Sequence, residues 1–321
     1  MVPKPPPRDS RPGFLYLPPY RLHGTSIAGE QTALHVPEFD VVFDMGQCLR
    51  SSLSANIVAL THSHMDHVGG LPYWFSQRYF QKIAGGKCLC HPDTADPIRK
   101  MLQSWAPIER QETPHEVVGV APEEEVPIRQ NVVLRAIESQ HTCPSLAWAI
   151  IEHRHKLKDE FKDLPQNELR RLREQGEEIT RSTEIPLIAY TGDTERGEFL
   201  ERPEFSKARV LITECTFFDP DHRERASIGR HLHFDDLADL SRKWEAEHIV
   251  VVHLSRRTML SSAAARIQEL GPELADRMHL LMDHRTNRRR YEAQVQEFMP
   301  EEQPGKNSGD SVSDETPKSS G

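Results

Sequence analysis

The sequence has few cysteines, and they are scattered along the chain. Five cysteines occur in 321 residues, and the only close pair is Cys88 and Cys90 within a predicted strand. An odd, dispersed set of this kind excludes a structural disulfide framework. The chain also lacks any run approaching about 18 apolar residues, and its first residues lack the apolar core of a secretion signal. We therefore expect a cytoplasmic protein with no membrane partner.

Basic residues are also fewer than acidic residues. The chain has 40 Lys and Arg against 49 Asp and Glu, a formal net charge of −9 at pH 7. This balance disfavours a general nucleic-acid-binding surface, although it is compatible with a local basic patch. The sequence contains no Gly-x-Ser-x-Gly motif, which would place a nucleophilic serine on a strained turn. Nothing therefore indicates covalent catalysis of that type.

Composition divides the chain into one domain and two tails. Residues 1–12 and 299–321 are rich in Pro, Ser, Gly and charge, so we expect them to be disordered. The length of residues 13–298 suits one large α/β domain. Within it, residues 152–184 form a highly charged insertion that predicts one or two short surface helices. Its mixed charges fit either a solvated face or a reduced RNA-binding arm.

The most informative positive feature is a cluster of histidines after a buried strand. The apolar run 57–60 is followed by His62, His64, Asp66 and His67. Such a loop lies at the carboxyl end of a strand, where α/β sheets place their ligands. Imidazole suits zinc, iron and manganese, and the carboxylate adds a harder oxygen ligand. The cluster therefore predicts a metal site in which one short loop serves two neighbouring ions.

Three further strand ends carry residues of the same chemistry. His141 follows the apolar segment 132–137, Asp193 follows 186–190, and His253 follows 249–252. Any one of these side chains alone is as often merely hydrogen-bonded as it is a metal ligand. Because all three follow predicted strands, we expect them to complete a dinuclear site.

With these residues the chain resembles the metallo-β-lactamase superfamily, and within it the ribonuclease Z group, which trims the 3′ ends of precursor tRNA. The His-x-His-x-Asp-His element at 62–67 carries the first likeness, and segments 144–147, 190–194 and 213–233 carry the second. The resemblance implies a four-layer αβ/βα sandwich with two divalent ions, foremost Zn²⁺, with Mn²⁺ or Fe²⁺ as alternatives. It also implies a homodimer. By this likeness one metal is held by His62, His64 and His141, the other by Asp66, His67 and His253, and Asp193 is shared.

The resemblance also implies a catalytic pair. In ribonuclease Z a Glu-Ala-Thr loop faces a His-Ser-Thr loop, and Glu214 and His231 fall on the Glu and His positions. A carboxylate beside an imidazole raises its basicity and orients it for general-acid catalysis. Since Leu232 and His233 replace Ser and Thr, either His231 or His233 could be the acid, and we assign His233 provisionally to substrate binding. The alternative is that both histidines merely flank a helix start.

Two residues beside the ligands receive substrate roles. Asp66 is expected to orient the attacking water as a base in addition to binding metal. Arg256 follows His253 closely enough to contact a substrate phosphate, for which guanidinium is well suited.

The predicted function is that of a dinuclear metal-dependent phosphodiester hydrolase, a ribonuclease Z-like endonuclease acting on precursor tRNA. The alternative is a hydrolase of the same fold acting on a small substrate, such as a cyclic nucleotide, lactone, thioester or sulfate ester. The absence of a full arm and the acidic balance favour that alternative. A third interpretation is a module of the same fold that binds two iron ions for oxygen chemistry or sensing. The sequence gives no indication of the fused flavin domain that would support this interpretation.

Overall fold

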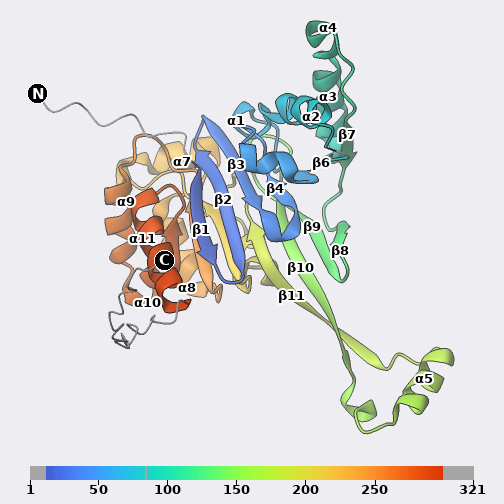
Figure 1. Cartoon of the computed structure of the whole chain (residues 1–321). Helices are drawn as coiled ribbons and strands as arrows, with labels where there is room; N and C mark the ends of the chain where they lie inside the picture. The colour runs from blue at the N-terminus through green and yellow to red at the C-terminus, as the bar shows by residue number, and fades with distance from the viewer. Residues whose placement is uncertain (1–11, 84, 299–321) are drawn as a thin grey trace, which may run out of the picture.

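The computed structural model describes residues 12–83 and 85–298. The expected tails therefore lie outside the described residues, apart from residue 12. Two sheets of seven strands each pack face to face, and helices cover their outer faces (Figure 1). This arrangement confirms the predicted four-layer αβ/βα sandwich. Among the described residues, no helix combines the length and the apolar character needed to cross a membrane.

The first sheet has its strands in sequence order, antiparallel from β1 to β4 and parallel from β4 to β7. Its strands are β1 (Gly13–Leu17), β2 (Tyr20–Ile27), β3 (Gln31–Val36), β4 (Val41–Phe43), β5 (Ile57–Ala59), β6 (Lys87–Cys90) and β7 (Glu116–Gly119).

The second sheet repeats the plan, antiparallel from β8 to β11 and parallel from β11 to β14. Its strands are β8 (Glu125–Arg129), β9 (Val132–Glu138), β10 (Leu146–Leu157), β11 (Thr180–Tyr190), β12 (Val210–Glu214), β13 (His248–Val252) and β14 (Met278–Leu280). The carboxyl ends of adjacent parallel strands meet at one edge, which gathers the loops that follow them.

The helices connect the strands on the outer faces, and short 3₁₀ turns complete the connections. The α-helices are α1 (Met65–Val68), α2 (Leu71–Phe80), α3 (Pro92–Gln103), α4 (Ala106–Glu109), α5 (Gln166–Glu174), α6 (Pro203–Ser206), α7 (Arg223–Gly229), α8 (Phe234–Lys243), α9 (Leu260–Gln268), α10 (Pro272–Arg277) and α11 (His284–Phe298). The 3₁₀ helices are η1 (Pro37–Phe39), η2 (Arg50–Ser54), η3 (Asp159–Phe161), η4 (Glu198–Glu201) and η5 (Pro220–His222).

Apolar side chains fill three interfaces. The cluster between the sheets includes Phe43, Trp148 and Tyr190, all fully buried. A second cluster lies under α8 and α9, and a third lies under α2 and α3. The aromatic-rich helix α2 divides by face, because Trp74 and Phe75 are buried whereas Tyr73, Tyr79 and Phe80 are exposed.

Hydrogen bonds join the two sheets beside the ligand loops. The indole N–H of Trp148 in β10 donates to the carbonyl of Leu60, and the amide of Leu146 donates to the carbonyl of Thr61. At the other side of the edge, the amide of His253 donates to Ser26 Oγ at 3.0 Å. Bonds from a rigid sheet fix the position of a loop, so the ligands of one sheet are held in register with those of the other.

The charged insertion contains one short α-helix and a 3₁₀ turn, in line with the predicted one or two short helices, but they lie at the end of a strand ribbon that was not predicted. Strands β10 and β11 extend beyond the sheet as an antiparallel ribbon, paired from His153–Glu184 to Leu157–Thr180, with η3 and α5 at its tip. Figure 1 shows this arm projecting away from the sandwich. In the ribbon, backbone groups form hydrogen bonds between the strands and the charged side chains point into water. A surface helix also exposes its charged side chains, so charge density alone could not distinguish the two structures.

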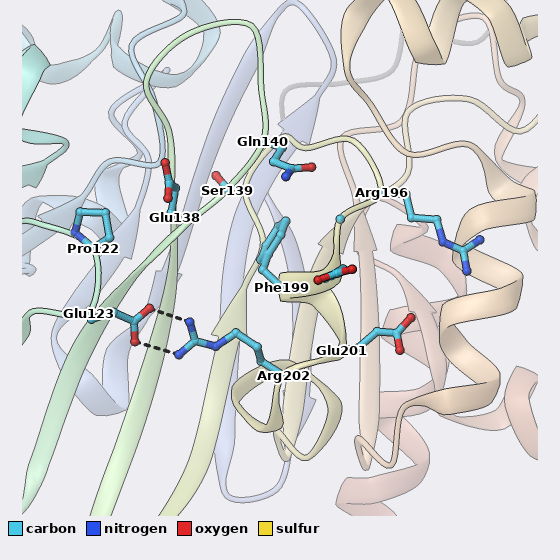
Figure 2. Close-up of a pocket in the computed structure, with 11 residues that line it drawn as sticks. Pro122, Glu123, Glu138, Ser139, Gln140, Arg196, Phe199, Glu201 and Arg202 are labelled. Atoms are coloured by element: carbon cyan, nitrogen blue, oxygen red, sulfur yellow. Dashed lines mark hydrogen bonds and ion pairs between the residues drawn. The ribbon is translucent and has the colours of Figure 1, made fainter.

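A cavity of about 900 Å³ opens beside the loop that carries His141 (Figure 2). Gln140 lies at its upper end, and Arg202 forms a two-point ion pair with Glu123 across its floor at 2.6 and 2.9 Å. The glutamates that line the cavity outnumber its two arginines. The resulting negative charge disfavours binding of a phosphate.

Candidate metal centre

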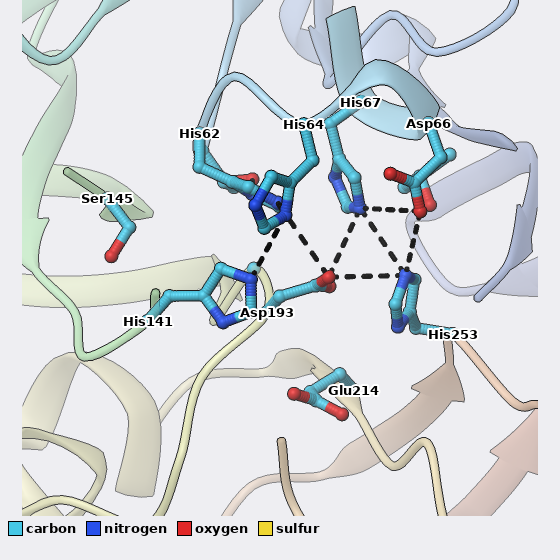
Figure 3. Close-up of polar contacts among 12 residues, drawn as sticks. His62, His64, Asp66, His67, His141, Ser145, Asp193, Glu214 and His253 are labelled. Carbon is cyan, nitrogen blue, oxygen red and sulfur yellow. Dashed lines mark hydrogen bonds and ion pairs between the residues drawn. The ribbon is translucent and has the colours of Figure 1, made fainter. Parts of the chain in front are cut away.

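All residues predicted to be metal ligands converge at one edge of the sandwich (Figure 3). They come from both sheets: the loop after β5 and helix α1 supply four, and the loops after β9, β11 and β13 supply one each. The ligands are His62, His64, Asp66, His67, His141, Asp193 and His253.

Three histidine nitrogens form the first subsite. His64 Nδ1 lies 3.0 Å from His62 Nε2 and 3.2 Å from His141 Nε2. In the second subsite, His253 Nε2 lies 3.4 Å from His67 Nε2 and 3.5 Å from Asp66 Oδ2.

The Asp193 carboxylate lies between the two subsites. Its Oδ2 is 3.2 Å from His253 Nε2, 3.3 Å from His67 Nε2 and 3.8 Å from His62 Nε2. The other oxygen, Oδ1, is buried and has no hydrogen-bond partner within residues 12–83 and 85–298. A buried carboxylate oxygen without a donor is costly, so this atom is suited to a cation.

The outer partners of the histidines show that a cation fits between them. Thr61 Oγ1 donates to Asp44 and so accepts from His62 Nδ1 at 3.0 Å. Asp44 accepts from His67 Nδ1 at 2.8 Å, and the carbonyl of Arg230 accepts from His141 Nδ1 at 3.1 Å.

Because each of these Nδ1 atoms carries its proton outward, the Nε2 atoms face one another with lone pairs only. Lone pairs at this spacing repel unless a cation lies between them, and such outer partners are typical of metal-bound histidine. The donor set of imidazoles and carboxylates suits Zn²⁺, Mn²⁺ or Fe²⁺.

Sequence reasoning missed Asp44, which organises the second subsite. Its carboxylate is fully buried and accepts from the amide and hydroxyl of Thr61, from His67 and from the hydroxyl of Tyr190. Its position was the available signal, since Asp44 directly follows β4 just as Asp193 lies just beyond β11.

The structure brings Glu214 and His231 together next to these ligands. His231 Nδ1 lies 2.9 Å from Glu214 Oε1, and its ring stacks at 5.4 Å from that of His253. Burial opposes protonation of His231, but the Glu214 carboxylate outweighs it and raises the pKa of the imidazole to about 9.

The two residues assigned to substrate contacts have different positions. His233 is fully buried, and both of its ring nitrogens are bonded, Nδ1 to the amide of Asp235 and Nε2 to the carbonyl of Asp219. It caps helix α8, so the expectation that it binds substrate or acts as the acid is wrong in geometry. Arg256 lies three residues beyond His253, is exposed and pairs with Glu30.

Comparison with known proteins defines the class first. The family model described as "Beta-lactamase superfamily domain" matches residues 39–254, and the chain belongs to this family. Among solved structures it is similar to the metallo-β-lactamase fold protein YhfI from Bacillus subtilis, at 14% identity and a TM-score of 0.54 over 77% of this chain and 90% of the other. The fold and the ligand clusters together make the site a divalent-metal centre.

Particular relatives then narrow the class. The Arabidopsis thaliana protein tRNase Z TRZ1 is 29% identical over 265 residues, which cover 82% of this chain and 95% of the relative. The chloroplastic tRNase Z TRZ2 of the same plant is 29% identical over 242 residues, or 74% and 68% of the two chains. The short form of human tRNase Z has a TM-score of 0.50 at 16% identity, covering 77% of this chain and 92% of that one. The two plant relatives confirm the resemblance to ribonuclease Z, and the human structure confirms the fold.

Proposed function

We propose that this protein is an endoribonuclease that removes the 3′ extension of precursor tRNA, using two Zn²⁺ ions. The observation that carries the proposal is the Glu214–His231 pair, held at 2.9 Å beside the ligand clusters. A small-substrate hydrolase with a good leaving group has no need of a dedicated acid, whereas cleavage at a ribose 3′ oxygen expels a poor leaving group that needs a proton. Relatives named tRNase Z support the substrate.

The ligands would hold the ions as two groups that share Asp193. Bound at these positions, the ions lower the pKa of a water and stabilise the charge that develops on the phosphodiester oxygens. Asp66 is the solvent-facing carboxylate of its group, with 14% of its side chain exposed, and Oδ2 accepts the amide of Gly29 at 2.9 Å. It is therefore placed to orient the attacking water.

His231 supplies the proton to the departing oxygen. Its Nδ1 is bonded to Glu214, which leaves Nε2 for the leaving group, and 17% of its side chain is exposed. The protonated imidazole gives its Nε2 proton to the 3′ oxygen as the phosphorus–oxygen bond breaks. Glu214 stabilises the charged form until that transfer and holds the ring in position.

The arm is proposed to bind a distant part of a long substrate. Its tip helix α5 exposes Arg170, Arg171 and Arg173, although Arg170 pairs with Glu174 at 2.9 Å. Figure 1 shows the tip far from the edge that carries the ligands. A small substrate in the metal centre would not reach it, whereas the phosphates of a folded RNA extend over such distances.

A homodimer would bury the exposed apolar side chains of α2 and α4. Phe80, Ile108, Tyr73 and Trp105 are 75%, 69%, 56% and 42% exposed. Helices α2 and α4 are joined by a hydrogen bond from Ser76 to Glu109, and large exposed apolar side chains on such neighbouring elements are typical of an interaction surface, so we propose that a second copy covers them. Size-exclusion chromatography with light scattering of the wild type and of a Phe80→Lys/Ile108→Lys variant tests this. A monomeric wild type would refute it.

Cleavage of two substrates tests the function. The first is an end-labelled precursor tRNA with a 3′ trailer, and the second is bis(p-nitrophenyl) phosphate, each with Zn²⁺ or Mn²⁺. We expect one cut at the 3′ end of the acceptor stem, lost in Asp66→Ala. Hydrolysis of the dye without any cut in the tRNA would refute the RNA substrate and point to a small-substrate hydrolase.

The arm is tested separately by charge reversal. Arg171→Glu/Arg173→Glu should lower kcat/KM for the tRNA and leave dye hydrolysis unchanged. The matched control is Lys100→Glu/Lys207→Glu, which makes the same charge change at exposed positions outside the arm. An equal loss in both double variants would mean that the arm makes no specific contact with RNA.

A further inference from the structure

Thr216 occupies the space between the metal ligands and the Glu214–His231 pair. It lies two residues beyond the last residue of β12 and is 3% exposed. Its Oγ1 is 2.7 Å from Glu214 Oε2, 3.0 Å from His253 Nδ1 and 3.3 Å from His231 Nδ1. One hydroxyl therefore contacts a metal ligand and both members of the catalytic pair.

A count of protons assigns a direction to each of these bonds. The single hydroxyl hydrogen goes to the carboxylate of Glu214, which is the shortest contact and accepts only. The oxygen lone pairs of Thr216 then accept from His253, so that Nδ1 carries the proton and Nε2 faces Asp66 and Asp193 unprotonated. His231 gives its own Nδ1 proton to Glu214, which is the closer acceptor at 2.9 Å.

The two carboxylate oxygens of Glu214 are thus linked by hydrogen bonds to two different histidines. Oε1 accepts from His231 and from the amide of Thr194, the residue after the shared ligand Asp193. Oε2 accepts from the amide and the hydroxyl of Thr216. Glu214 is fully buried, so its carboxylate oxygens accept hydrogen bonds from these protein groups and not from solvent. The Thr216 hydroxyl links this carboxylate by hydrogen bonds to His253.

We propose that Thr216 is a positioning residue that holds His253 in its metal-binding tautomer and links the Asp66–His67–His253 subsite to the carboxylate that supports the acid His231. This proposal rests on the proposed two-metal hydrolase. Loss of the hydroxyl should weaken metal binding at one subsite and leave the Glu214–His231 bond in place. Loss of the Glu214 carboxylate should impair both.

Metal affinity of the metal-free protein provides the direct test. Zn²⁺ is titrated against a chromophoric chelator into the wild type, Thr216→Val, Thr216→Ser and Thr213→Val, and Co²⁺ spectra report the geometry at each bound ion. Valine matches threonine in shape but lacks the hydroxyl. Loss of an outer partner of a metal ligand typically weakens binding about 10–100-fold, and we expect this loss for one of the two ions in Thr216→Val.

The serine variant and Thr213→Val are the matched controls. Thr216→Ser restores the hydroxyl and should bind both ions like the wild type. Thr213 is buried in β12, three residues before Thr216, but its hydroxyl contacts Thr191 and a backbone carbonyl rather than a ligand, so Thr213→Val should also retain both affinities. If Thr216→Val fails to fold, Thr216→Ala carries the same prediction. Unchanged affinity in the folded variant, or an equal loss in Thr216→Ser, would overturn the proposal.

Activity at saturating metal tests the link to the acid. Excess Zn²⁺ should restore most of the tRNA cleavage by Thr216→Val but not that by Glu214→Gln, which also loses the support of His231. If saturating metal leaves both variants equally impaired, Thr216 does not act through His253. The affinity measurements use no substrate, so failure of the tRNA assay would refute the proposed function without bearing on Thr216.

Discussion

Replacing Asp44 by asparagine should weaken metal binding although Asp44 is not one of the proposed ligands. The carboxylate accepts from His67 Nδ1 at 2.8 Å, from Thr61 at 2.7 Å (amide) and 2.9 Å (hydroxyl), and from the hydroxyl of Tyr190 at 3.0 Å. All of these partners donate. An asparagine would keep the shape, but its NH₂ group would face a donor instead of accepting from it.

The structure sets the size of the effect. If the NH₂ faces His67, the imidazole either loses its partner or reverses its tautomer and turns an Nε2 proton toward Asp193, which excludes a metal. A hydrogen bond to a charged group contributes about 1.5–3 kcal/mol. That range matches the roughly 10–100-fold loss of affinity seen when outer partners of metal ligands are removed. We expect this loss at the Asp66–His67–His253 subsite.

Chelator competition with Zn²⁺ measures the affinity, and urea unfolding of the metal-free protein shows whether the variant is folded. Asp40→Asn is the matched control, because Asp40 also has a positive φ at a strand boundary, φ 60° against 59° for Asp44, and its carboxylate contacts Asn56 rather than a ligand. A folded Asp44→Asn protein that binds two ions like the wild type would refute the reasoning.

Three further predictions concern single positions. His231→Asn should slow tRNA cleavage about 10²–10⁴-fold, the usual contribution of a general acid, and should slow hydrolysis of a nitrophenyl ester far less, since nitrophenolate leaves unprotonated; equal losses would contradict the assigned role. Burial, helped by the nearby His23, lowers the pKa of His35 to about 4, so stability that is complete above pH 6.5 should fall by about 3 kcal/mol as the pH drops to 4, because the unfolded chain takes up the proton. Urea unfolding across this range should show a smaller pH dependence of stability in His35→Leu than in the wild type. An unchanged pH dependence would contradict the role assigned to His35. Gly46→Ala should destabilise the fold by about 3 kcal/mol or more, since its Cβ would lie 1.7 Å from the carbonyl oxygen of Asp66, whereas Gly29→Ala, with open space around it, should cost about 1 kcal/mol; similar melting temperatures for the two variants would count against this.

The ligand set and the fold class were readable from the sequence because both depend on local patterns. His62 to His67 form one contiguous motif, and His141, Asp193 and His253 each follow a recognisable strand end. In a sheet with parallel strands, such ends must meet at one edge, so the order of residues along the chain was enough to predict that these side chains come together. The Glu214–His231 pair was predicted from the resemblance to ribonuclease Z, whose paired loops match segment 213–233.

The tertiary structure alone decided which histidine is placed to act and what holds the ligands in position. His231 and His233 are neighbours in sequence, but only His231 faces Glu214 and the metal ligands, because His233 caps α8. The partners Asp44 and Thr216 act through hydrogen bonds to residues 23 and 37 positions away. Such bonds depend on how strands and sheets pair over long range, which no local pattern specifies. The same reason explains the arm: its short helix α5 was predicted, but the ribbon that carries this helix forms by pairing of β10 with β11.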